Sequence, residues 1–167
     1  MKRLLLILTV LGACARPNDN VALRDEAIAT SHFYKDVVEA LNKRGGDIVT
    51  RSGKVPNVQS APGAQQARDA IQTAGTTLGT LRGMVEEGAD HKSQIEKQAE
   101  QLFKDGKTAE LQKLISESNE SLEVGTREVA SALNVFEAWV DGLEKQTAVV
   151  ATAPTTPPSA DAAGMAQ

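Results

Sequence analysis

Apolar residues recur at alternating steps of four and three along the middle of the chain. The clearest series is Ala67, Ile71, Ala74, Leu78, Leu81 and Val85. The same count continues through Gly88, Lys92, Ile95, Ala99 and Leu102, although Gly88 and Lys92 fit a buried seam poorly. This spacing places the side chains on one face of a helix, as the a and d positions of a coiled coil do. It predicts a single helix from about Ala64 to Asp105.

A break in this helix at Gly88-Ala89-Asp90 is the competing interpretation. Glycine is common directly after the last residue of a helix, and aspartate is a favoured N-cap residue. Further along, Asp105-Gly106-Lys107-Thr108 predicts a tight turn in which Gly106 ends one helix and Thr108 caps the next. The middle of the chain therefore forms either one long helix or two shorter helices before this turn.

A second series with the same spacing follows the turn and predicts a long final helix. Its members are Leu111, Ile115, Ser118, Leu122, Gly125, Val129, Ala132, Phe136, Trp139 and Leu143. The small residues Ser118, Gly125 and Ala132 would allow another helix backbone to approach closely. Phe136 and Trp139 would fill a wider end of the core.

A first helix is predicted from Val21 to about Arg44. One helical face is marked by Val21, Ile28, Phe33, Val37, Val38 and Leu41, and N-cap candidates are Asn18, Asp19 and Asn20. Gly45-Gly46 is expected to end this helix. The segment from Gly45 to Gly63, which is rich in glycine and proline, is expected to be a long connection that is functional or mobile.

The composition favours the all-α class. The chain of 167 residues is 41% hydrophobic but only 3% aromatic, a balance closer to helical bundles than to β-sandwiches. We therefore expect an elongated helical bundle with coiled-coil-like heptad seams over residues 21–148. It contains three helices, or four if the second one breaks. Residues 149–167 are rich in alanine, threonine and proline and are expected to form a disordered tail.

The N-terminus carries an export signal. Met1-Lys2-Arg3 is positively charged, and the apolar run from Leu4 to Leu11 is far shorter than the roughly 20 residues that a membrane-spanning helix needs. The run ends in Leu11-Gly12-Ala13-Cys14, which resembles the lipobox of bacterial lipoproteins. The resemblance covers only this segment. It implies cleavage between Ala13 and Cys14 and attachment of lipid to the Cys14 sulfur.

The resemblance also implies a division of the chain and a location. Residues 1–13 form a signal peptide and residues 14–20 a lipidated tether, so the membrane is a partner through acyl chains. Ala15-Arg16 lacks the aspartate that resembles an inner-membrane retention signal. This favours the periplasmic face of the outer membrane. A conventional signal peptide cleaved after Ala13, with an incidental cysteine, is the alternative.

Charge and motifs exclude several function classes. A net charge of −4 offers no sequence-wide basic footprint, so nucleic acid is not an expected partner. No nucleotide-binding, hydrolase or zinc-protease motif is present, and we expect no catalytic residues, no enzyme activity and no cofactor besides the covalent lipid. His32 with Asp36, and His91 with Glu87, could share helix faces and bind a metal weakly. Such pairs are usually solvated, and no metal site is assigned.

Protein contacts are the expected mode of action. We expect a lipid-anchored envelope protein that serves as an adaptor or structural element, with an envelope protein or a second copy as its partner. The contact surface would be the segment from Gly45 to Gly63 or the acidic face between Glu86 and Glu144. The alternative is an envelope module that binds a small ligand or metal through His32 and His91. The aromatic pairs Phe33-Tyr34 and Phe136-Trp139 are expected in the core rather than in a ligand cage.

Overall fold

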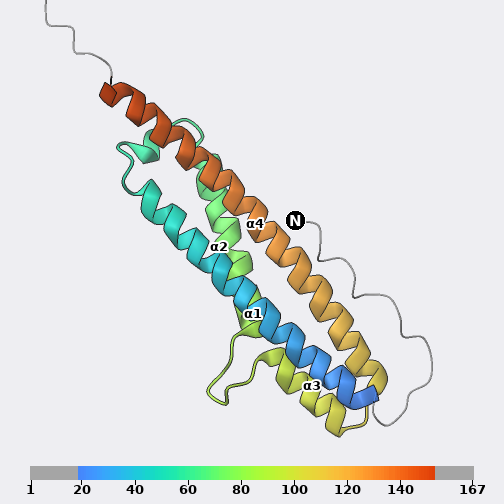
Figure 1. Ribbon diagram of the computed structural model, residues 1–167. Helices are drawn as coiled ribbons and strands as arrows, with labels where there is room; N and C mark the ends of the chain where they lie inside the picture. Colours follow the sequence, from blue (N-terminus) through green and yellow to red (C-terminus); the bar gives the residue numbers. More distant parts are fainter. Residues whose placement is uncertain (1–18, 153–167) are drawn as a thin grey trace, which may run out of the picture.

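The computed structural model describes residues 19–152 and is all-α (Figure 1). Its elements are α1 (Asp19–Ser52), the short 3-10 helix η1 (Val58–Ser60), α2 (Ala64–Val85), α3 (Gln94–Lys104) and α4 (Thr108–Thr152). The expected class, an elongated helical bundle, is confirmed for this part of the chain, which contains no strand. The predicted signal peptide, the lipid attachment residue Cys14 and residues 15–18 of the predicted tether lie outside the described residues, as does most of the predicted tail.

The four helices form three columns, because α2 and α3 share one of them (Figure 1). Helices α1 and α4 run in parallel: Thr108 at the start of α4 donates to Asn20 at the start of α1, and Arg51 near the end of α1 donates to Glu144. Helices α2 and α3 run in the opposite direction. At 1.5 Å per residue, α1 is about 51 Å long, which about matches α2 and α3 together.

Two ends of the bundle follow from this topology. The α3–α4 end holds the start of α1 and the turn between α3 and α4 (Figure 1). The α1–α2 end holds the end of α1, the connection from Gly53 to Gly63 and the last turns of α4. The core runs between them along α4, whose buried residues include Leu111, Ile115, Ser118, Leu122, Gly125, Val129, Leu133, Phe136, Val140 and Leu143. Most of these are the predicted seam positions, and Leu133 and Val140 join them because α4 packs against every other helix.

The predicted end of the first helix at Gly45-Gly46 is wrong. Helix α1 continues through both glycines to Ser52, where packing against α4 explains the continuation. Gly45 is buried, and a Cβ there would lie 3.4 Å from Leu133 Cδ2. Ile48, one turn further, is only 1% exposed. This burial offsets the helix penalty of glycine, and the connection shortens to Gly53–Gly63.

The predicted single helix from Ala64 to Asp105 is also wrong, and the competing break is correct. Helix α2 ends at Val85 and α3 begins at Gln94. The cap differs from the expected Asp90: Ser93 Oγ accepts a hydrogen bond from Glu96 N at 3.2 Å, and Ser93 N donates to Glu96 Oε2 at 3.1 Å. This capping box satisfies two backbone donors at the start of α3.

The last helix begins as predicted but ends later than expected. Gly106 adopts a left-handed conformation, with φ of 66°, and its turn is closed by a hydrogen bond from Lys107 N to Leu102 O. Thr108 then opens α4. The helix extends to Thr152, so residues 149–152 are helical instead of belonging to a disordered tail.

Gly79→Ala and Gly125→Ala test the close approach of α2 to α4. A Cβ at Gly79 meets no atom within 4 Å, whereas one at Gly125 would lie 2.7 Å from Leu81 Cδ2. Gly79→Ala should raise the free energy of unfolding by about 1 kcal/mol, because alanine favours the helix. Gly125→Ala should forfeit that gain, because the buried Leu81 must move. Urea unfolding followed by circular dichroism measures both, and equal gains would contradict the close approach.

Candidate functional site

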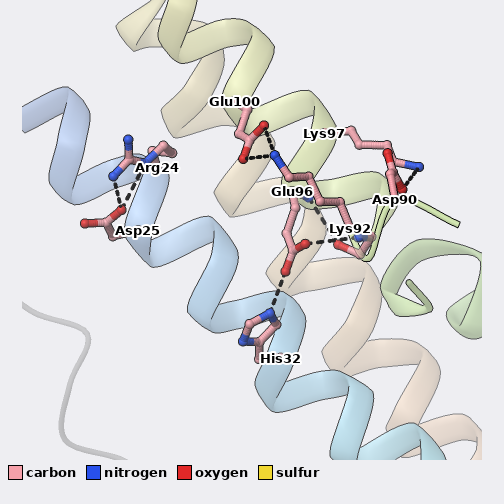
Figure 2. A network of polar contacts seen from close by, with 9 residues as sticks. Arg24, Asp25, His32, Asp90, Lys92, Glu96, Lys97 and Glu100 are labelled. Atoms are coloured by element: carbon pink, nitrogen blue, oxygen red, sulfur yellow. Dashed lines mark hydrogen bonds and ion pairs between the residues drawn. The ribbon is translucent and has the colours of Figure 1, made fainter. Parts of the chain in front are cut away.

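The first polar cluster joins α1 to the start of α3. Ser31 Oγ donates to Ser93 Oγ at 2.6 Å, and both serines are completely buried. Glu96, the capping-box residue of α3, is itself only 4% exposed. Its Oε1 lies 2.6 Å from Nε2 of His32 on α1 (Figure 2). Burial of a carboxylate is costly unless it is paired, so this imidazole is an important partner for α3.

His32 therefore contacts α3 rather than making the expected same-helix pair with Asp36. Glu96 Oε2 accepts from Ser93 N, whereas the buried Oε1 forms no hydrogen bond among the described residues and has the ion-pair contact with His32. The imidazole is mostly exposed, with 62% of its side-chain surface accessible. The contact thus links a buried carboxylate to a mostly exposed side chain.

Ion pairs surround this cluster (Figure 2). Lys35 Nζ lies 2.7 Å from Glu87 Oε1 and lowers the pKa of Glu87 mainly through that hydrogen bond. Lys92 lies 2.6 Å from Glu100 and similarly lowers the pKa of that carboxyl. Because Glu87 is paired with Lys35, the expected pairing of Glu87 with His91 is not its main interaction. His91 is exposed and has a φ of 57° in the connection between α2 and α3.

A second cluster of charges joins α1 to α4 near the α1–α2 end. Arg51 donates to Asp141 and, at 2.6 Å, to Glu144, while Arg44 donates to Glu137 one turn away. These hydrogen bonds raise the pKa of Arg51 and lower the pKa of Glu144. Because the carboxylates recur along one face of α4, the two arginines neutralise charges that would otherwise repel each other.

The connection Gly53–Gly63 is fixed to α4 by Trp139. The indole Nε1 donates to Pro62 O at 2.8 Å, and a Cβ at Gly63, whose φ is 79°, would lie 3.3 Å from the indole. The Trp139 ring also stacks on Phe136, with centroids 5.9 Å apart. The same end of the bundle has an open groove of about 260 Å³. It is lined by Arg51, Lys54, Val55, Pro56, Glu144, Thr147 and Ala148. The predicted contact segment is thus an ordered surface over its described residues.

The two predicted aromatic pairs have different outcomes. Phe136 is buried and Trp139 is half-buried against the core, as expected. Phe33 is 52% exposed, so its expected place in the core is wrong. Its ring packs edge-on against Tyr34, whose centroid is 5.1 Å away and whose pKa is raised mainly by burial. Phe33 lies on the outer side of α1, whereas Tyr34 turns inward.

Two kinds of feature are absent from the described residues. Within 19–152 no group of three histidine, cysteine or acidic side chains is placed to hold a metal ion. None of the helices in that range is long and apolar enough to cross a membrane.

The predicted acidic face on α4 includes the exposed residues Glu117, Glu120, Glu123 and Glu128. Part of its charge is balanced, because Arg127 pairs with Glu123 and Lys113 with Glu117.

Comparison with known proteins adds no assignment to this geometry. No protein-family model, no curated protein and no solved structure matches the chain. The Ser93-x-x-Glu96 pattern in the sequence is a signal that predicts this capping box. Nothing in the sequence pairs His32 with Glu96, which lie far apart along the chain.

Arg51→Ala tests whether the second cluster stabilises the α1–α4 contact. Removing this guanidinium leaves Asp141 and Glu144 without their shared partner, so the urea midpoint should fall and become less sensitive to added salt. Arg127→Ala is the matched control, because Arg127 pairs only within α4 through Glu123. A midpoint for Arg51→Ala that is no lower than that of Arg127→Ala would show that the cluster does not join the helices.

Proposed function

We propose that this protein is a lipid-anchored component of the bacterial cell envelope that acts through protein contacts, as an adaptor or structural element. The observation that carries the proposal is the segment Leu11-Gly12-Ala13-Cys14, which resembles a lipobox and stands five residues before α1 begins at Asp19. Two or three acyl chains hold a protein on a membrane far more firmly than one. The periplasmic face of the outer membrane is the proposed location.

The topology supports different roles for the two ends of the bundle. Asp19 belongs to the α3–α4 end, so an anchor at Cys14 would place that end toward the bilayer. The α1–α2 end, with the ordered connection Gly53–Gly63 and its groove, would face away from the membrane. This end is our proposed contact surface, and the acidic face of α4 is the second candidate.

A small-ligand or metal-binding module is the weaker proposal. Its two polar leads were His32 and His91, each with a nearby carboxylate. His32 already contacts the buried Glu96, and Lys35 holds Glu87, the expected partner of His91. A metal at either pair would have to displace the existing contact of that pair, which lowers the affinity expected there.

Cys14→Ser tests the anchor. In bacteria fed an alkyne-tagged palmitate, the native chain should become labelled, should sediment with membranes and should have Cys14 as the first residue of its mature form. Cys14→Ser should lose the label, because no other cysteine is present. Ala15→Ser, which keeps the cysteine, is the control and should be labelled normally. A native chain that carries no label and remains in the soluble fraction would refute the anchor.

Crosslinking in cells tests the adaptor role. The native chain and Cys14→Ser are each crosslinked, purified by affinity and analysed by mass spectrometry. We expect one discrete envelope protein that is recovered with the native chain and lost with Cys14→Ser, with crosslinks from Lys54 near the groove. Recovery of the chain alone, as a monomer, would contradict both the adaptor and the self-association forms of the proposal.

A further inference from the structure

Polar contacts join α3 and its N-cap to α1 beside a small apolar contact. The fully or nearly buried apolar residues of this 11-residue helix are Ile95 and Ala99, and Leu102 is partly buried. The polar contacts with α1 include the buried pair Ser31–Ser93, the His32–Glu96 contact, and Arg24 stacked 4.8 Å above the Phe103 ring. An element with few buried apolar contacts opens locally more easily than the rest of a protein.

Glu96 is the residue on which this attachment depends most. Both of its carboxylate oxygens are needed at the start of α3: Oε2 accepts from Ser93 N, and Oε1 faces His32. A carboxylate that is 4% exposed cannot replace a lost partner with bulk water without opening the contact. His32, in contrast, is mostly exposed to solvent.

We propose that the His32–Glu96 contact is a pH-sensitive latch that holds α3 on α1 more tightly near pH 5.5 than near pH 8. Histidine is the side chain that ordinarily gains its charge between these values. A protonated imidazole at 2.6 Å balances the charge of the buried Glu96 carboxylate. A neutral imidazole leaves that charge unpaired at Oε1, which forms no hydrogen bond among the described residues.

The surrounding charges leave His32 as the group that changes. Titratable groups near it include Lys35 and Asp36 on α1, Glu87, His91 and Lys92 on the connection, and Glu96 and Glu100 on α3. The hydrogen bonds from Lys35 and Lys92 lower the pKa of Glu87 and Glu100, so these two carboxylates stay ionised from pH 5.5 to 8. The chain contains two histidines, so His91 is the matched control.

Hydrogen exchange of the full chain in detergent, corrected for the intrinsic effect of pH, measures the latch. Amides of α3 should open about fivefold more often at pH 8 than at pH 5.5, while amides at the centre of α4 should not change. His32→Gln should remove the difference, because the glutamine amide can donate to Glu96 but does not titrate. His91→Gln should keep it.

Three outcomes would overturn the latch. An unchanged pH response in His32→Gln would show that another group is responsible. Loss of the response in His91→Gln would show that the pH dependence comes from His91 rather than from His32. An equal response in α3 and in the centre of α4 would show that pH acts on the whole bundle rather than on the α3 contact.

Discussion

The long seam of α4 is the constraint on which the rest of the structure depends. Its buried residues from Leu111 to Leu143 face α1, α2 and α3 in turn, so each of those helices finds its register against one continuous element. The surfaces facing it mix alanine with larger residues such as Leu78 and Ile95, and the backbones can approach closely where α4 has a small residue. Gly125 shows this directly, because Leu81 of α2 occupies the space that a side chain there would need.

The periodicity predicted which residues would be buried better than it predicted where helices would end. Ile95 and Ala99 lie in the core, as their positions in the series indicated, although the helix proposed to contain them is broken. The break coincides with residues 86–93, which are mostly charged or small, and the capping box at Ser93 gives α3 its own start. Gly45 was predicted to end a helix but lies inside one. Its packing against Leu133 is a tertiary effect that local propensity cannot reveal.

The candidate sites could be predicted even less, because each of their main contacts joins distant parts of the chain. Asp36 was the natural partner of His32 by helical spacing, but the antiparallel course of α3 brings Glu96 there instead. Arg51 meets Asp141 and Glu144 because α1 and α4 are parallel, a consequence of α2 and α3 together crossing the bundle once. Both pairings depend on how the helices are arranged in space. The spacing of charges along one helix cannot predict that arrangement.

The two ends of the bundle are held by different kinds of interaction. At the α1–α2 end, Trp139 combines aromatic stacking with a hydrogen bond to Pro62, and Arg51 bridges two carboxylates, so several groups must be lost before this end opens. At the α3–α4 end a short helix depends on a buried carboxylate and an exposed imidazole. Under the proposed anchoring, the end nearer the bilayer is the one that responds to pH. The proposed contact surface lies at the other end, about 30 Å along α1 from His32.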